Sequence, residues 1–148
     1  MIAVVQRVNS CVVSIDNKDS SSIGVGVLVL LGIEDGDGFD DIKYCAKKLI
    51  NLRIFNDNHD KMNLSVIDVN AEIMIVSQFT LCGNTKKGNR PSYVSAMDVN
   101  LAKKLYNKFL DYMNQCYSKV KSGTFQADMN IKLENSGPVT LIIRSRNS

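Results

Sequence analysis

Apolar runs rich in valine and isoleucine alternate along this chain with two segments in which apolar residues recur every three or four positions. The runs are typical of β-strands, whereas the spacing in residues 39–50 and 101–116 predicts amphipathic helices that pack one face on a sheet. The chain has 148 residues and no internal repeat or low-complexity linker. We therefore predict a single α/β domain spanning residues 1–148, with mixed β-sheets and two main amphipathic helices.

The first expected strands lie at the N-terminus. Residues 2–8 and 11–15 are rich in β-branched side chains and are separated by Asn9 and Ser10, so we predict that they pair with each other. Residues 16–22 are polar and are expected to form a turn. The remaining expected strands are residues 23–33, 53–55, 65–67, 71–81, 120–125, 131–133 and 139–143.

Composition narrows the class of protein. A net charge of +3 with 45% hydrophobic residues is typical of a globular protein and falls short of a dedicated nucleic-acid-coating protein. The longest apolar stretch, residues 23–33, is too short for a bilayer span of about 20 residues. The N-terminus also lacks the basic lead of a signal peptide. We predict a soluble, cytoplasmic protein with no membrane partner.

The cysteine and histidine content argues against a metal centre. The four cysteines include no Cys-x-x-Cys pair, and His59 is the only histidine, so we predict no metal and no cofactor. Cys45 and Cys116 fall on apolar helical faces, and we expect both to be buried as small hydrophobic residues. Cys82 is expected to be packed as well. His59 lies in a turn-rich segment and is expected to be a solvated surface residue.

Three segments carry groups suited to holding a ligand. Residues 77–81 read Ser-Gln-Phe-Thr-Leu, and residues 135–140 read Asn-Ser-Gly-Pro-Val-Thr. Each places hydroxyl or amide groups, or a Gly-Pro dipeptide, at the end of a strand-like run, where backbone atoms can be presented to a ligand. In the third segment we predict contact with a phosphate backbone, a solvated polar loop being the alternative. Its cations are Lys86, Lys87 and Arg90.

Together, residues 77–81 and 135–140 resemble the two signature motifs of the D-aminoacyl-tRNA deacylases. These enzymes hydrolyse the ester that joins a D-amino acid to the 3′ end of tRNA. The resemblance extends over essentially the whole chain, and it implies a deacylase-like fold and activity, with aminoacyl-tRNA as the substrate. The further matching segments are residues 5–8, 25–32, 51–55, 61–65, 87–92 and 125–129.

The resemblance also implies roles for single residues. The catalytic pocket would be lined by Ser77, Gln78, Phe79 and Thr80. Backbone N–H groups near Phe79 and Thr80 would stabilise the developing oxyanion, and the neighbouring 2′-OH of the substrate would move protons, so that no side-chain base is needed. Thr80 resembles a residue sometimes proposed as the nucleophile, but we expect it to act by position.

Selection against L-amino acids would rest on Gly137 and Pro138. By resemblance, their peptide bond is cis and enters the active site of a second subunit, which makes the enzyme a homodimer with active sites at the interface. Glycyl-tRNA, which has no side chain, would escape this filter. Arg7 would support the Gly-Pro segment through backbone carbonyls, and Phe125 and Met129 would shape the adenine or amino-acid pocket.

Three departures from the family pattern bear on these roles. Ser136 stands where the family commonly has Asp, Gln126 stands where it commonly has Gly, and Cys82 follows the first motif. Gln126 raises the question of the local backbone, because glycine often marks a φ angle that other residues adopt at a cost. Two alternative functions remain at this stage: a non-catalytic RNA-binding module, and a small-molecule esterase that uses Ser77 or Cys82 with His59.

Overall fold

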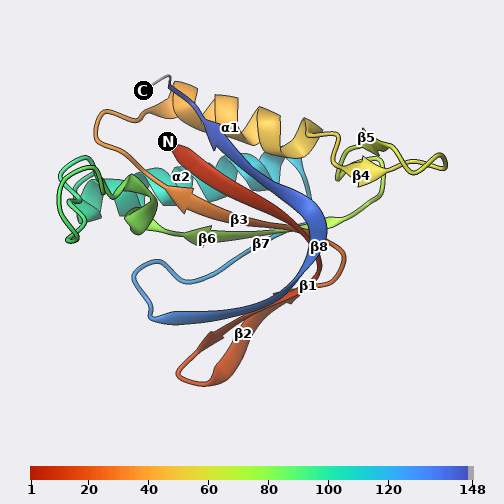
Figure 1. Cartoon of the computed structure of the whole chain (residues 1–148), viewed down its shortest axis with the longest axis horizontal. Helices are drawn as coiled ribbons and strands as arrows, with labels where there is room; N and C mark the ends of the chain where they lie inside the picture. Colours follow the sequence, from red (N-terminus) through yellow and green to blue (C-terminus); the bar gives the residue numbers. More distant parts are fainter. Residues whose placement is uncertain (147–148) are drawn as a thin grey trace.

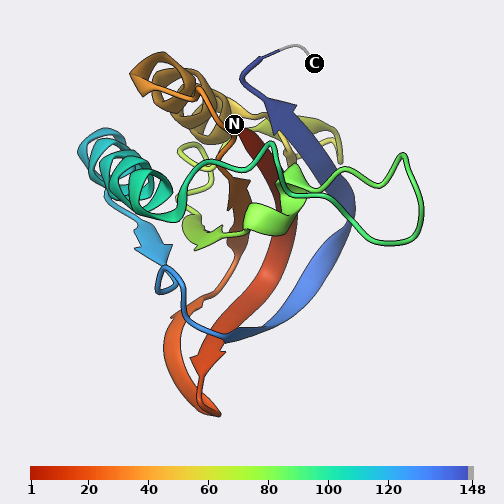
Figure 2. The same ribbon diagram turned by 90° about the vertical axis from the view of Figure 1, so that its left-hand side faces the viewer.

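Two helices lie side by side across one face of a six-stranded sheet, as Figure 1 and, after a quarter turn, Figure 2 show. The computed structural model describes residues 1–146. The predicted α/β domain with a mixed sheet is therefore confirmed. The helices are α1 (Phe39–Asn51) and α2 (Val99–Cys116), and the sheet strands are β1 (Ile2–Ile15), β2 (Lys18–Ile23), β3 (Gly26–Gly32), β6 (Glu72–Ser77), β7 (Val120–Ser122) and β8 (Met129–Arg144).

The long strand β1 organises the sheet. Its first half pairs antiparallel with β3, its second half pairs antiparallel with β2, and β8 runs antiparallel along its other side. β3 pairs parallel with β6, and β6 pairs parallel with β7. Of these parallel strands, β3 and β6 lie beneath the helices and are nearly continuous in apolar residues, as expected for strands covered on both faces.

The helices form where apolar spacing and capping agree. In α1, Ile42, Cys45 and Leu49 recur at intervals of three and four residues, and all three are buried. α2 begins after Asp98, whose carboxylate accepts hydrogen bonds from two N–H groups of the first turn. Such a cap satisfies donors that have no partner within the helix. Within residues 1–146, no helix combines the length and apolarity that crossing a bilayer requires.

The main core lies between the helices and the sheet. Tyr106, Phe109 and Met113 of α2 are almost completely buried there, against residues such as Leu31 and Ile75 of the central strands. A smaller second cluster fills the opposite face of the sheet, where the long strands β1 and β8 bend (Figure 1). Its buried members are Val8, Cys11, Val13, Ile23, Leu28, Met74 and Val76.

The predicted N-terminal hairpin is wrong. Residues 2–8 and 11–15 belong to the one strand β1, which passes through the exposed residues Asn9 and Ser10. β8 pairs along the whole of β1 and absorbs the irregularity as register shifts around Val8, so long-range pairing prevails over the local turn signal. Residues 131–133 and 139–143 likewise form the single strand β8 rather than two.

Other strand boundaries also differ from the prediction. The expected turn at residues 16–22 is confined to Asp16 and Asn17, which have left-handed φ angles, and β2 follows at once. Gly24 and Val25 interrupt the expected strand 23–33. The strand after residue 71 ends at Ser77 and gives way to a 3₁₀ helix, η1 (Phe79–Cys82). A separate hairpin is formed by β4 (Phe55–Asn56) and β5 (Met62–Leu64), and residues 65–67 fall outside it.

The cysteines show where helical periodicity misleads. Cys45 and Cys82 are buried, as predicted. Cys116 is exposed, which contradicts the prediction, because it is the last residue of α2, beyond the last buried position at Met113.

Candidate active site

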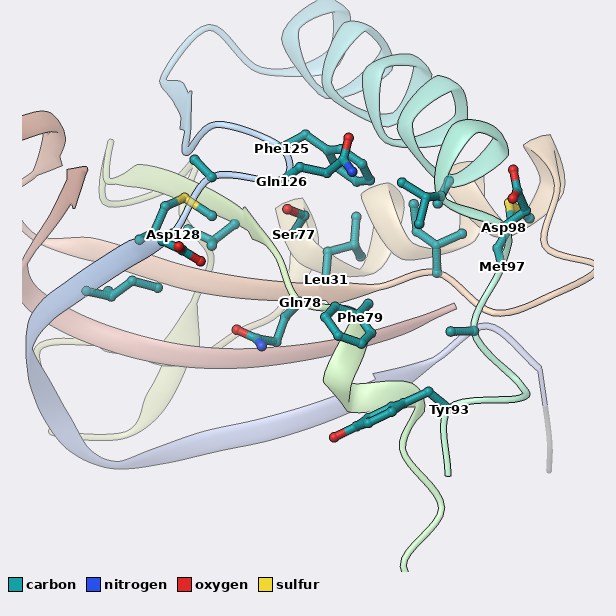
Figure 3. A pocket seen from close by; sticks show the side chains of 18 residues that line it. Leu31, Ser77, Gln78, Phe79, Tyr93, Met97, Asp98, Phe125, Gln126 and Asp128 are labelled. Atoms are coloured by element: carbon teal, nitrogen blue, oxygen red, sulfur yellow. The ribbon is translucent and has the colours of Figure 1, made fainter. Parts of the chain in front are cut away.

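A cavity of about 650 Å³ opens beside the carboxyl end of β6 and the amino end of α2 (Figure 3). Four segments line it: the end of β3 with Leu31 and Ile33, residues 76–79, the stretch from Tyr93 into α2, and residues 125–131. They bring together five residues that the sequence predicted for the site, which are Ser77, Gln78, Phe79, Phe125 and Met129.

Strand pairing positions the first motif at this cavity. Ser77 is the last residue of β6 and lies level with Leu31 of β3, and the N–H of Gln78 donates to the carbonyl of Leu31 at 2.8 Å. The chain then turns into η1. Thr80 is exposed and is not among the lining residues; its hydroxyl accepts a hydrogen bond from the Gln78 side chain at 2.6 Å. The Thr80 hydroxyl is therefore paired with the Gln78 side chain and does not line the cavity.

The backbone at this turn offers two hydrogen-bond donors. Among residues 1–146, no acceptor receives a hydrogen bond from the N–H groups of Phe79 or Thr80, whereas the next N–H, that of Leu81, donates to the carbonyl of Gln78. Free donors of this kind arise where the first residues of a helical turn have no partner in the preceding turn. Phe79 lines the cavity, so its N–H is available there to a ligand atom that carries negative charge, whereas Thr80 does not line it.

A buried tyrosine fixes the wall beneath the cavity. The hydroxyl of Tyr106 donates to the carbonyl of Ile75 at 3.1 Å, and the Tyr106 ring lies 5.4 Å from that of Phe125, between ring centroids. Burial raises the pKa of Tyr106, so that the hydroxyl stays protonated. Tyr106 thus holds α2, β6 and the segment around Phe125 in a fixed relation.

The second motif lies around Arg7. The Arg7 guanidinium donates to the carbonyls of Ile54 at 2.6 Å, Gly137 at 3.1 Å and Ser136 at 3.3 Å. Arg7 is only 8% exposed. The Gly137–Pro138 peptide bond is cis, as the family resemblance implies. The contact predicted between Arg7 and the carbonyls of the Gly-Pro segment is therefore present.

The cations expected to meet RNA lie outside the cavity. Asn84 and Ser92 pair through two backbone hydrogen bonds of 2.7 and 3.0 Å, which close a loop, here called the basic loop, over residues 84–92. The basic loop extends from the molecule next to η1 (Figure 2). Its cations, Lys86, Lys87 and Arg90, are all exposed.

Comparison with known proteins decides the family. The model of the family described as D-Tyr-tRNA(Tyr) deacylase matches residues 4–144. The chain belongs to this family. A D-aminoacyl-tRNA deacylase of Clostridium beijerinckii is 49% identical over 146 residues, covering 99% of this chain and 98% of the relative. One from Parabacteroides distasonis is 52% identical over 148 residues, covering 99% of each.

Solved structures agree with this membership. A structure described as c-Myc DNA Unwinding Element Binding Protein is similar with a TM-score of 0.95 and 39% identity, over 99% of this chain and 100% of that one. A probable eukaryotic D-amino acid tRNA deacylase shares the fold, with a TM-score of 0.79 and 19% identity over 96% and 97% of the two chains. The predicted family, the deacylase-like fold and the assignment to deacylase enzymes are thereby confirmed.

One deacylase chain does not bring its two motifs together. Ser77 is level with Leu31 and, through it, with Ala3, whereas the Gly-Pro segment lies level with Arg7. β1 and β3 lie between β6 and β8, the strands that carry the two motifs. Neither Gly137 nor Pro138 is among the residues that line the cavity of the same chain.

The ionisable groups near the cavity do not form a catalytic triad. Among the lining residues, only Asp98, Asp128 and Tyr93 can ionise. Burial raises the pKa of the Cys82 thiol to about 11, which leaves it protonated at neutral pH. His59 lies in the exposed turn between β4 and β5, which Figure 1 shows at the opposite end of the molecule from η1. The structure thus gives the esterase alternative no nucleophile–histidine pair.

Residues 1–146 also contain no group of three or more His, Cys, Asp or Glu side chains arranged to hold a metal ion.

The three ionisable lining residues, Asp98, Asp128 and Tyr93, are not predicted from the sequence as part of the site. Asp98 carries an available signal, because an Asp directly before a helical apolar pattern is a typical N-cap. Asp128 lies within a segment that matches the family, but no local pattern in the sequence assigns it a role. Tyr93 follows the basic loop and has no local signal, since only the folded chain brings its ring to Phe79.

Of the three departures from the family pattern, Gln126 has the clearest structural consequence. Its φ angle is +63°, in the left-handed region that glycine adopts freely. The backbone shape is thus the one a glycine would favour, and Gln126 retains it. Ser136 contributes its carbonyl to Arg7, a contact that does not depend on the side chain.

Proposed function

We propose that this protein hydrolyses the ester bond of D-aminoacyl-tRNA, releasing the free D-amino acid and tRNA, and thereby removes D-amino acids from translation in the cytoplasm. The observation that carries the proposal is the match to the deacylase family over residues 4–144, which includes both motifs. The cavity at Ser77, Gln78 and Phe79 supports it with space for an aminoacyl-adenosine and with the unpaired backbone N–H of Phe79.

The chemistry follows from positioning and from fixed donors. The ester carbonyl lies near the turn after Ser77, and the N–H of Phe79, which lines the cavity, stabilises the negative charge that develops on its oxygen. The substrate's own 2′-OH orients water or relays a proton, so that the absence of a histidine from the lining residues is no obstacle. Gln78 holds the 3′ adenosine, and Phe125 and Met129 shape the walls around the adenine or the amino acid.

The active site is completed by a second copy of the chain. The position of the Gly-Pro segment supports this arrangement, because neither Gly137 nor Pro138 is among the residues that line the cavity of the same chain. In a homodimer, Gly137 and Pro138 of one copy enter the cavity of the other and occupy the position that an L side chain would take. A glycyl ester has no side chain to reject, so glycine mischarged on a non-cognate tRNA is also hydrolysed.

The test is hydrolysis of D-tyrosyl-tRNA and L-tyrosyl-tRNA side by side, with a chelator present to remove contaminating metals. Rapid cleavage of the D-ester alone is expected. The second candidate is a nucleic-acid-binding module without activity, which the likeness to the protein described as c-Myc DNA Unwinding Element Binding Protein supports. Binding of charged tRNA with no cleavage of either ester would favour that candidate and refute the deacylase.

A further inference from the structure

Two aromatic rings stand exposed at the mouth of the cavity. Phe79 is 61% exposed and Tyr93 is 38% exposed, and their rings meet edge to face with centroids 5.2 Å apart (Figure 3). Val94 beside them is 91% exposed. Single exposed apolar residues are common on protein surfaces, but a contiguous aromatic pair at the edge of a ligand cavity indicates a binding surface.

The local backbone holds Tyr93 in this place. A Cβ atom at Gly83 would lie 2.9 Å from the Tyr93 ring, so the ring packs directly against the bare backbone of Gly83. The pairing of Asn84 with Ser92 then closes the basic loop immediately beyond these two residues. The aromatic pair and the basic loop are therefore anchored at the same place in the fold, and the cations of the loop extend from the edge of the aromatic surface.

Charge distinguishes the sides of the cavity mouth. The α2 side carries the carboxylate of Asp98, and the segment leading into β8 carries that of Asp128. The basic loop has three cations and no carboxylate, as residues 84–92 show. A polyanion that ends inside the cavity is repelled at the first two sides and attracted at the third, so it leaves across Phe79 and Tyr93.

We propose that the ring of Tyr93, braced edge to face by Phe79, is a stacking platform for the base of the nucleotide that precedes the terminal adenosine of the substrate, while the basic loop binds its phosphates. This inference rests on the proposed function and extends it from the ester to the single-stranded 3′ end. Proteins that bind single strands combine aromatic faces on which bases stack with a cationic path along the backbone. Because every base has a stacking face, the platform recognises single-stranded character and not sequence.

The experiment compares two D-tyrosyl-tRNA substrates that differ only in whether the penultimate nucleotide carries its base or is abasic. Wild-type protein is expected to lose about tenfold in kcat/KM on the abasic substrate, the typical worth of one stacked base. On the intact substrate, kcat/KM of Tyr93→Ala should be about tenfold lower than that of the wild type. On the abasic substrate, kcat/KM of Tyr93→Ala should be close to that of the wild type, because the stacking contact is already lost. Tyr93→Phe, which keeps the ring, should retain the dependence on the base.

A matched control is Leu101→Ala, since Leu101 is 54% exposed on the α2 side and does not line the cavity. This variant should keep the wild-type dependence on the base. Equal hydrolysis of both substrates by the wild type, or losses from Tyr93→Ala and the abasic site that simply multiply, would overturn the platform. Failure of the wild type to cleave either substrate would instead refute the proposed deacylase, so the two outcomes are distinct. Thermal unfolding of Tyr93→Ala verifies that the variant is folded.

Discussion

Replacing Arg7 with lysine keeps the positive charge but removes the planar fork that holds the Gly-Pro segment. The guanidinium donates at once to the carbonyls of Ile54, Ser136 and Gly137. A lysine ammonium is a single point, and from this buried position it can keep the shortest contact, to Ile54, while losing the other two. The substitution thus tests the fork without removing the charge.

The magnitude follows from the two lost bonds. Hydrogen bonds to charged groups are worth about 1.5–3 kcal/mol, but Ser136 is half-buried and Gly137 is exposed, so water replaces part of the loss. We therefore expect about 1 kcal/mol for each bond and about 2 kcal/mol in total. For a chain of this size, that loss lowers Tm by about 4–8 °C.

Two assays measure the effect. Urea unfolding should show a lower midpoint with an unchanged m-value. Hydrolysis of D-tyrosyl-tRNA should fall by up to about 100-fold, because a shift of about 1 Å in a positioning segment has effects of this size. The ratio of D-ester to L-ester hydrolysis should fall with it.

Gln6→Ala is the matched control. It removes one exposed hydrogen bond between β1 and β8, from Gln6 to Thr140, next to the same segment. A substitution of this kind should change stability by less than about 0.5 kcal/mol. If Arg7→Lys were no more destabilising than Gln6→Ala and left stereoselectivity intact, the reasoning about the fork would be refuted.

Three further predictions follow from the site and its surroundings. Tyr106→Phe removes the buried hydroxyl that bonds to Ile75, and chemical denaturation should show a loss of about 1 kcal/mol, whereas an unchanged midpoint would contradict the anchoring role. Replacing the three cations of the basic loop with glutamine should flatten the slope of log KM against log salt by about 2, as expected for three contacts to a single strand. The same change at Lys103 and Lys104 of α2 should leave the slope unaltered. At pH 8, a thiol reagent should label Cys116 alone in the native protein and all four cysteines in urea, because the other three are buried. Burial also raises the pKa of Cys82 to about 11, which keeps this thiol protonated. Rapid labelling of Cys82 in the native protein would show that its site is open.

Local sequence patterns predict the parts of this fold that depend on local contacts. The two helices are predictable because the positions of Ile42, Cys45 and Leu49 match the helical period and each is buried on the same face. The single strand β1 is not predictable from local patterns, because its continuity past Asn9 and Ser10 depends on pairing with β8, more than 100 residues away. Apolar periodicity also does not show at which residue a helix leaves the core, so it wrongly predicts that Cys116 is buried.

In the candidate site, too, the residues of local motifs are predictable from the sequence, whereas contacts made only by the folded chain are not. Motifs and resemblance predict Ser77, Gln78 and Phe79, and the structure brings them to one cavity with Phe125. The role of Thr80 as a partner of Gln78 depends on the 3₁₀ turn, where the sequence predicted a strand. Tyr93 joins the cavity only through contacts across the folded chain, for which the sequence holds no short-range signal.

The central claim is that the pocket of one copy works with the Gly-Pro segment of another. Two variants test this claim: one impairs the pocket, and the other impairs the Gly-Pro segment. Phe79→Pro removes a backbone donor at the first position of η1, where proline is tolerated. It should lose about 100-fold or more in kcat, and Phe79→Ala, which keeps the N–H, controls for loss of the ring. Arg7→Ala releases the Gly-Pro segment and leaves the pocket intact.

The decisive measurement is hydrolysis of D-tyrosyl-tRNA by an equal mixture of Phe79→Pro and Arg7→Ala after subunit exchange. In a two-fold dimer with shared sites, half of the dimers are mixed, and each mixed dimer has one intact site. The mixture should therefore recover about a quarter of wild-type activity. Activity no higher than the mean of the two variants, with mixed dimers demonstrated by mass, would contradict the claim.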